Sequence, residues 1–321
     1  MDSEVIASAE AQIVGRTSVT TSIQIPFPPG KNEMTVRIVA TDTIEVAGQP
    51  AILKLKRPEH VDELAGRLFV LTVGVSQYKF PEYNLTYAAT DAKTLATALK
   101  NQEGLAFGEV HTQVYTDDKA TIENVRIGLE WLQRVATEHD VAVVFFSGHG
   151  LKGRRGLYYV THEGDTEAIQ YTCLNWEDIA MSLQKTNAKQ TLFLSDACHA
   201  GAFAETQLAT QADLARQLLE IDRVLVFASS KGEEFSLERP DWGHGAFTKA
   251  LLEALGGQGD TNTDSSISIM ELIEYTKDRV TSLTGHQQHP YLPKTSGFDG
   301  KLTISRLPSK SREPGLTSGS D

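Results

Sequence analysis

Two short apolar segments, each followed at once by chemically reactive side chains, place the strongest constraint on how this chain can fold. The first covers residues 141–146 and is followed by Ser-Gly-His-Gly at 147–150. The second covers residues 191–194 and is followed by Ser-Asp-Ala-Cys-His-Ala-Gly at 195–201. Short runs that are rich in β-branched and aromatic residues are typical of buried strands, because a buried helix needs a longer run. We therefore predict a buried strand at each of the two positions.

The segment between these runs favours a parallel arrangement of the two strands. Residues 175–185 carry apolar side chains among polar ones, which weakly indicates a helix. Parallel strands require a crossover connection of this kind. The carboxyl ends of parallel neighbours share one edge of the sheet, where open α/β sheets place their sites. We therefore expect His149 and Cys198 to arrive together at that edge.

His149 and Cys198 are the residue types of a cysteine nucleophile and its base. A thiol is a weak nucleophile until an imidazole within hydrogen-bond reach takes its proton. The glycines on either side of His149 allow a sharp turn and leave the amide of Gly150 free to face a developing oxyanion. His199 is a less favoured base, because adjacent side chains tend to point apart.

A simpler interpretation is that these residues are structural. A free cysteine is most often a small buried hydrophobe, and a lone histidine after a strand is usually a satisfied polar residue. We favour that interpretation for Cys173, which has no matching context. For His149 and Cys198 we favour the catalytic one, because strand, chain turn and reactive residue coincide twice.

The two motifs, Ser-Gly-His-Gly and Asp-Ala-Cys-His-Ala-Gly, together resemble those of the caspase-like cysteine peptidases of family C14, which include bacterial caspase-like proteins and metacaspases. His149 precedes Cys198 by about 50 residues, as in the caspase signature. The resemblance extends from about residue 68 to 307. It implies an α/β fold with a mostly parallel sheet and helices on both faces. It also implies a thiol protease in which Cys198 attacks, His149 transfers the proton, and the amides of Gly150 and Cys198 hold the oxyanion.

Asp196 bears on specificity, because caspases that cut after aspartate have glutamine two residues before the nucleophile. A carboxylate there repels an acidic substrate side chain and pairs with a basic one. Asp91 matches a second acidic pocket position of metacaspases, although it is otherwise explained as a solvated charge at a helix N-terminus. Two carboxylates favour arginine over lysine, because a guanidinium presents a planar fork. We expect protein or peptide substrates cut after Arg, with Lys tolerated, and Ser229 as a third substrate-binding candidate.

A run of oxygen-bearing side chains late in the chain resembles an EF-hand calcium loop. The candidate ligands are Asp260, Asn262, Asp264 and Glu271. At position 6, however, Ser265 replaces the glycine that makes the sharp turn. We favour a capped helix start instead, and the resemblance implies a short strand at 267–269 and a helix that begins near Glu271. Calcium activation occurs in metacaspases through a different acidic cluster. No metal or organic cofactor is required for the expected chemistry.

We expect four parts along the chain. The first is a β-rich segment that resembles the closing strands of an immunoglobulin-like sandwich, although its three or four strands are fewer than the usual seven. Either the chain is a fragment of a longer protein, or this segment packs on the peptidase domain or on another subunit; we favour the simpler interpretation of a structural spacer. The parts are residues 1–57, the β-rich segment with strands at 22–25, 34–40 and 51–55; 58–67, a linker; 68–307, the peptidase domain; and 308–321, a disordered Gly/Ser/Pro-rich tail.

The pattern of the peptidase domain alternates strands with helices, which indicates a mostly parallel sheet. Strands are expected at 68–75, 109–115 (at an edge) and 224–228, and helices at 87–100, 122–135 and 249–255. Residues 203–222 are polar, and in the family the corresponding region is often cut during activation. Arg216 and Arg223 are candidate cleavage points there, for self-cleavage or for an upstream activating protease, and an uncut surface excursion explains the composition equally well.

Composition excludes several classes of protein. The 321 residues carry a net charge of −12, which argues against a nucleic-acid-binding surface. No apolar stretch approaches the roughly 18 residues of a membrane span, and the first residues lack the features of a signal peptide. Two cysteines, of which one is assigned to catalysis, fit a reducing compartment such as the cytoplasm.

Two alternatives stay open. The first is a catalytically silent module that keeps the caspase fold and recruits partners through its β-rich segment; the presence of both His149 and Cys198 argues against it. The second is a related peptidase with asparaginyl or other specificity. That alternative leaves Asp91 and Asp196 without a role.

Overall fold

The computed structural model describes residues 33–38, 51–56, 65–153, 156–196, 223–231, 234–293 and 298–308. The chain divides into two compact units, Met1–Glu63 and Leu64–Asp321. In the first unit, β1 (Glu33–Ile38) and β2 (Ala51–Lys56) form an antiparallel pair, which confirms two of the predicted strands. The predicted strand at 22–25 lies outside the described residues, as do most of the predicted linker and residues 309–321 of the tail.

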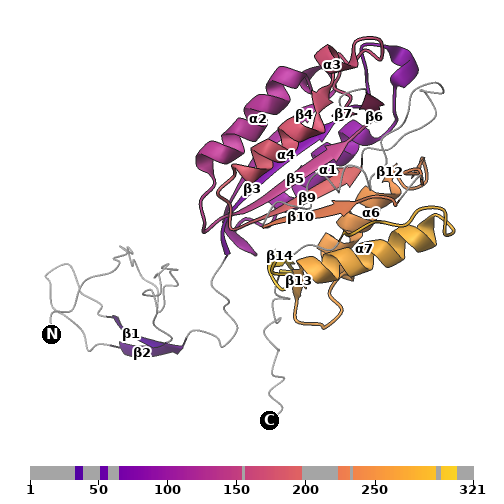
Figure 1. Ribbon diagram of the computed structural model, residues 1–321. Helices are drawn as coiled ribbons and strands as arrows, with labels where there is room; N and C mark the ends of the chain where they lie inside the picture. Colours follow the sequence, from indigo (N-terminus) through magenta and orange to yellow (C-terminus); the bar gives the residue numbers. More distant parts are fainter. Residues whose placement is uncertain are drawn as a thin grey trace, which may run out of the picture. The chain divides into compact units, whose positions relative to one another are not determined.

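The second unit is built on a five-stranded sheet in the order β10-β9-β5-β3-β4, with every neighbouring pair parallel (Figure 1). This confirms the predicted α/β class, the parallel pairing of the two motif-bearing strands and the edge position of β4. Because β3 begins at Ala65, the predicted linker, which was expected to reach residue 67, ends earlier. The strands are β3 (Ala65–Gly74), β4 (Phe107–Thr116), β5 (Val141–Ser147), β9 (Gln190–Asp196) and β10 (Val224–Ala228).

Helices cover both faces of this sheet. The helices α2 and α4 belong to one cluster of buried side chains, and α1, α6 and α7 belong to a second cluster. The predicted helix at 249–255 begins earlier, at Ala246, because Gly245 is extended and ends the preceding turn there. The helices are α1 (Ala88–Lys100), α2 (Ile122–Val135), α3 (Ile169–Thr172), α4 (Trp176–Gln184), α6 (Ala246–Glu253) and α7 (Ile269–Leu283), with a π-helical extension at Ala254–Gln258 and single 3-10 turns at Pro81–Tyr83 and Asp117–Lys119.

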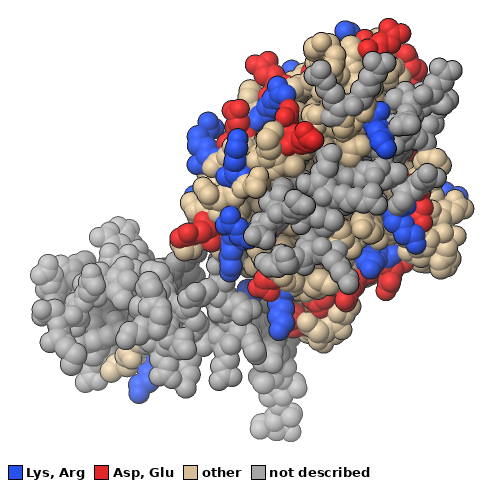
Figure 2. Space-filling model, viewed as in Figure 1, with Lys and Arg blue, Asp and Glu red and all other residues tan. Residues whose placement is uncertain are grey.

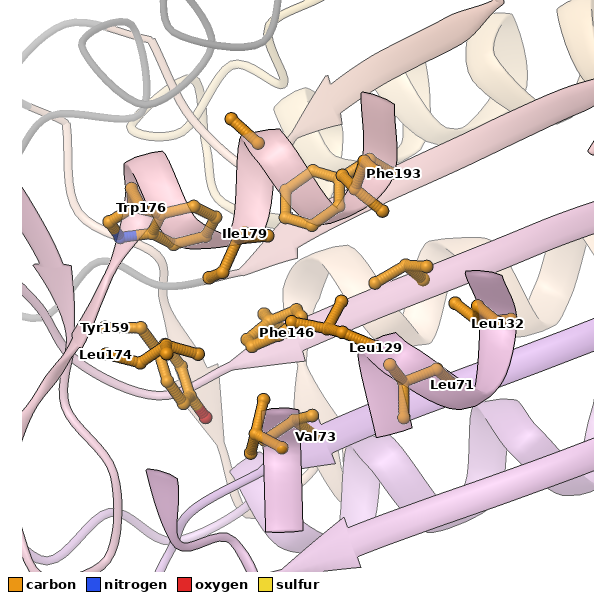
Figure 3. Packing of buried hydrophobic residues seen from close by; sticks show 14 of the residues in the cluster. Leu71, Val73, Leu129, Leu132, Phe146, Tyr159, Leu174, Trp176, Ile179 and Phe193 are labelled. Atoms are coloured by element: carbon orange, nitrogen blue, oxygen red, sulfur yellow. The ribbon is translucent and has the colours of Figure 1, made fainter. Parts of the chain in front are cut away.

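The central strands supply side chains to both clusters. Alternate residues point to opposite faces of a strand, so Val144 and Phe146 of β5 join one cluster while Val143 and Phe145 join the other. This explains why the strand is apolar throughout. In the first cluster the ring of Trp176, at the start of α4, packs edge-on against Phe193 of β9 at 5.6 Å and tilted against Phe146 at 5.8 Å (Figure 3).

Smaller strands lie outside the five-stranded sheet. A hairpin of β6 and β7 follows His149 directly and is extended by β8, and the sequence pattern did not predict it. The antiparallel pairs β11-β12 and β13-β14 lie later in the chain. These strands are β6 (Gly150–Gly153), β7 (Gly156–Tyr159), β8 (Leu174–Asn175), β11 (Glu238–Arg239), β12 (His244–Gly245), β13 (Ser266–Ser268) and β14 (Thr303–Arg306).

On the face shown in Figure 2, acidic and basic side chains of the described residues are interspersed. Within the described ranges, no helix is both long enough and apolar enough to cross a membrane.

Candidate active site

The two central motif-bearing strands end level with one another. In the parallel register of β5 and β9, Ser147 lies opposite Asp196. The amide of Gly148 continues the pairing by donating to the carbonyl oxygen of Asp196 at 3.3 Å. His149 and Cys198 each come two residues after this matched pair. Cys198 itself, with the rest of 197–222, lies outside the described residues, so the structure describes the histidine and the strand that leads to the cysteine.

The turn that carries His149 is fixed by two tyrosine hydroxyls. Gly148 has a φ of 150°, and a Cβ added there would lie 2.9 Å from the Tyr78 hydroxyl and 3.0 Å from the Tyr159 hydroxyl. The Tyr159 hydroxyl donates to the carbonyl of Ser147 at 2.7 Å, and the His149 amide donates to the Tyr78 hydroxyl at 3.1 Å. Burial raises the pKa of both phenols above the ordinary value, so they stay neutral. Only glycine fits at position 148 without displacing these groups.

The His149 imidazole is oriented by a backbone carbonyl. Its Nε2 lies 2.8 Å from the carbonyl oxygen of Tyr83, in the 3-10 turn at 81–83. A carbonyl oxygen only accepts, so Nε2 carries the proton and donates it. In the neutral ring, Nδ1 is then the basic atom. Sequence reasoning missed Tyr83, because a backbone carbonyl leaves no side-chain signal. Gly150, the predicted oxyanion residue, is buried at the start of β6.

The two predicted acidic residues lie together. Asp91 is in the first turn of α1 and Asp196 ends β9, and they are 2% and 3% exposed. A Cβ added to Gly245 would lie 3.2 Å from Oδ2 of Asp91 and 3.3 Å from Oδ2 of Asp196, so the two carboxylates both lie close to this glycine. The interpretation of Asp91 as a solvated helix-terminal charge is therefore wrong.

Asp91 has two donors from one short segment of chain. His244 Nδ1 lies 2.6 Å from its Oδ1, and the amide of Gly245 donates to its Oδ2 at 3.1 Å. Burial raises the pKa of Asp91, the hydrogen bond from His244 opposes the rise, and the nearby Asp196 adds to it, giving a value of about 6. His244 was not among the predicted site residues, because its sequence signal is only a Gly-His-Gly triplet before an apolar helix.

Ser229 comes directly after β10, at the same edge of the sheet. Its amide donates to the carbonyl of Ser195 at 2.8 Å, and its own carbonyl accepts from Gln288 Nε2 at 2.8 Å. The side chain is fully buried, and its hydroxyl is hydrogen-bonded to the hydroxyl of Ser236. Ser229 thus lies near Asp196 at this edge of the sheet, while its side chain supports the segment at 234–237. Its role in substrate binding stays a prediction.

The EF-hand-like segment forms a helix cap. The Ser268 side chain accepts from the amide of Glu271, and the Glu271 carboxylate accepts from the amide of Ser268 at 2.9 Å. This confirms the favoured interpretation of a capped helix start. The carboxylates of Asp260 and Asp264 accept amides within the loop, and Ser265 has the positive φ, 66°, expected of position 6. Among the described residues, no group of three or more His, Cys, Asp or Glu is arranged to hold a metal ion.

Cys173 is buried in the first cluster of apolar side chains. Burial raises the pKa of its thiol to about 12, so it stays protonated and unreactive near neutral pH. The structural interpretation of this cysteine is confirmed.

The comparisons with known proteins agree with this architecture. The family model described as the caspase domain of peptidase family C14 matches residues 67–298. Among solved structures, the chain is similar to the crystal structure of protein GSU0716 from Geobacter sulfurreducens. The identity is 14%, the match covers 75% of this chain and 100% of that chain, and the TM-score is 0.54. That likeness concerns the fold alone. No curated protein matches the sequence.

Proposed function

Because the chain belongs to the caspase-domain family of cysteine peptidases, we propose that it is an endopeptidase that cuts proteins or peptides after arginine, with lysine tolerated. The observation that carries the specificity is the pair of buried carboxylates, Asp91 and Asp196, which both lie close to Gly245. They belong to the same sheet edge as His149. The proposed thiol chemistry suits a reducing compartment such as the cytoplasm.

In the proposed reaction, Cys198 gives its thiol proton to His149 and its sulfur attacks the carbonyl carbon of the scissile bond. The amides of Gly150 and Cys198 hold the oxyanion, and the imidazolium returns the proton to the leaving amine. Water then hydrolyses the thioester. The Nε2–H bond to the Tyr83 carbonyl supports the role of His149, because it leaves Nδ1 as the acceptor atom. No metal takes part in these steps.

The specificity follows from charge in a buried pocket. A guanidinium has five N–H donors in a planar fork and can engage two carboxylates at once, whereas an ammonium offers a compact point charge. An acidic side chain in the same position meets two like charges in a dry environment. The level ends of β5 and β9 support placing this recognition next to the scissile bond, since Asp196 is two residues from Cys198.

The test is hydrolysis of matched fluorogenic peptides that end in Arg, Lys, Asp or Asn. We expect cleavage after Arg, weaker cleavage after Lys, and none by the Cys198→Ala variant. The assay is run with and without calcium, and before and after limited proteolysis, so that activation by a ligand or by an upstream protease is detected. Cleavage confined to Asp or Asn would remove the pocket assignment. Silence under every condition would favour a non-catalytic module with the caspase fold.

A further inference from the structure

His244 stands between the buried carboxylate pair and solvent. Its Nδ1 contacts Asp91 at 2.6 Å, and its side chain is 20% exposed while that of Asp91 is 3% exposed. The histidine also lines a surface pocket of about 460 Å³, whose other walls come from Trp242 and from α6 and the segment after it. The imidazole is therefore partly accessible to solvent, whereas the Asp91 carboxylate is almost completely buried.

We propose that His244 is a specificity-determining residue of the acidic pocket, which holds the Asp91 carboxylate in place for a basic substrate side chain. This inference rests on the proposed cleavage after arginine. It assigns a role to a residue that does not touch the scissile bond. It also makes substrate affinity, separately from the chemical step, dependent on that residue.

The geometry explains how His244 positions the carboxylate. Asp91 receives His244 on Oδ1 and the Gly245 amide on Oδ2, so both oxygens are fixed by adjacent residues of β12. Because the position of a Cβ on Gly245 is within 3.3 Å of both carboxylates, no larger residue fits there without crowding them. A carboxylate oxygen accepts more than one hydrogen bond. The fixed Asp91 therefore retains acceptor capacity for a guanidinium that also reaches Asp196.

The charge of the pocket depends on the protonation of the pair. Two ionised carboxylates carry a charge of about −2, and protonation of Asp91 reduces it to about −1. The pKa of Asp91, which burial raises to about 6, supports a change of state close to neutral pH. A basic side chain is attracted more strongly by the more negative pocket. The affinity for an arginine side chain is therefore expected to rise with pH.

The other charged groups around His244 have partners of their own. Glu238 of β11 accepts the amides of Thr86 and Tyr87 before α1. Arg239, which pairs with His244 across β11 and β12, places its guanidinium over Trp242 at 5.2 Å. On α6, Lys249 and Glu253 form an ion pair at 3.2 Å. Asp91 is thus the charged group that His244 contacts directly, and Asp196 is the charge beside it.

The experiment measures binding of agmatine, a small guanidinium compound, to the full chain carrying Cys198→Ala, by calorimetry between about pH 5.5 and 8. This background removes the titration of the thiol and the chemical step. We expect the Kd to fall about tenfold with rising pH. The matched variants, each added to Cys198→Ala, are His244→Asn, which keeps an N–H donor near the Nδ1 position without a charge, and His244→Ala, which removes the donor.

His244→Asn, which keeps a donor to Asp91, should bind agmatine about as tightly as the parent at each pH, and His244→Ala should bind about tenfold more weakly throughout. The same difference is expected in KM for an arginine peptide in the active enzyme, with kcat little changed. A His244→Ala profile that follows the parent overturns the inference but leaves the proposed function intact. If the unmodified chain cuts no arginine peptide and the parent binds no agmatine, the proposed function fails and the inference fails with it.

Discussion

At the scale of single residues, the candidate site is a set of buried polar groups, each held by one backbone group and one side chain. His149 is oriented by the Tyr83 carbonyl and the Tyr78 hydroxyl, and Asp91 by His244 and the Gly245 amide. Backbone partners are rigid, so a catalytic or binding group that depends on them is held in place before substrate arrives. Each of these contacts therefore has a measurable consequence.

Burial of Asp91 destabilises the fold when the carboxyl group is ionised, which is the form that the proposed function requires. Its pKa is raised from 3.8 to about 6, so the stabilising contribution of its neutral form is complete below pH 3.8 and is lost as the pH rises through about 6. Asparagine mimics the neutral acid. We expect Asp91→Asn to raise the free energy of unfolding at pH 8 by on the order of 2 kcal/mol, measured in urea, with little difference at pH 4. It should also lose most cleavage after arginine.

The control for Asp91 is the same substitution at the exposed Asp241, which should change neither stability nor specificity at either pH. A lower stability of Asp91→Asn at pH 8 would contradict the account, because it would mean that the carboxylate stabilises the fold there.

Gly148 is the residue at which the turn before His149 tolerates least change. Gly148→Ala places a methyl group against the hydroxyls of Tyr78 and Tyr159 at a positive φ, and we expect the loss of about 100-fold or more in kcat/KM together with a lower melting temperature. Gly104 also has a positive φ, 75°, but a Cβ there meets nothing within 4 Å. Gly104→Ala therefore costs about 1 kcal/mol of strain and should keep its activity. Equal losses of activity in the two variants would argue against a special role for the turn.

At the scale of elements, the register of parallel strands places the site, and polar contacts at the strand starts maintain that register. Asp140, just before β5, is 3% exposed at its side chain and binds Arg67 of β3 at 2.7 Å and the Thr137 amide at 2.8 Å. Burial alone would raise the pKa of Asp140. The hydrogen bonds from Arg67 and Thr137 outweigh burial and lower the pKa to about 2.

The sign of this shift predicts a pH dependence opposite to that of Asp91. The contribution of Asp140 is present above pH 3.8 and is lost as the pH falls through about 2. We expect Asp140→Asn to reduce the free energy of unfolding by about 1–3 kcal/mol at pH 7, measured in urea, and to converge on the wild type near pH 2. A constant difference at both pH values would exclude the ion pair as its cause.

Measurements at the start of α7 distinguish a helix cap from a calcium site. Ser268→Ala removes the acceptor for the Glu271 amide and should reduce the free energy of unfolding by about 1 kcal/mol. Because Glu271 is engaged in the capping box, we expect millimolar calcium to leave the melting temperature of the wild type unchanged. A melting temperature that rises with calcium and falls again with a chelator would instead support the ligand set of Asp260, Asn262, Asp264 and Glu271.

At the scale of the whole molecule, the strands and helices that follow a local or periodic sequence pattern were predicted correctly. The strands β5, β9 and β10 are short and buried throughout, and α2 begins and ends where its pattern predicts, at Ile122 and Val135. The pocket roles of Asp91 and Asp196 were inferred from the resemblance to the caspase-like family, and their proximity depends on the crossover order of the sheet. The β6-β7 hairpin was missed because its strands are short and rich in glycine.

The missed site groups have a different explanation. His244 contacts Asp91 across a separation of 153 residues, and the Tyr83 carbonyl contacts His149 across 66. Neither contact has a periodic or local signature, because each is created only when β12 and the turn at 81–83 pack at the carboxyl edge of the sheet. Tertiary structure alone brings these pairs together.

The measurement that tests the central claim most directly is a cleavage map of an unfolded protein mixture digested by the full chain, read by mass spectrometry beside Cys198→Ala. The account predicts new ends after arginine, fewer after lysine, none in the variant, and a sharp loss of the arginine sites in Asp91→Asn. Cleavage that persists in Cys198→Ala, or that follows aspartate or asparagine, would contradict it.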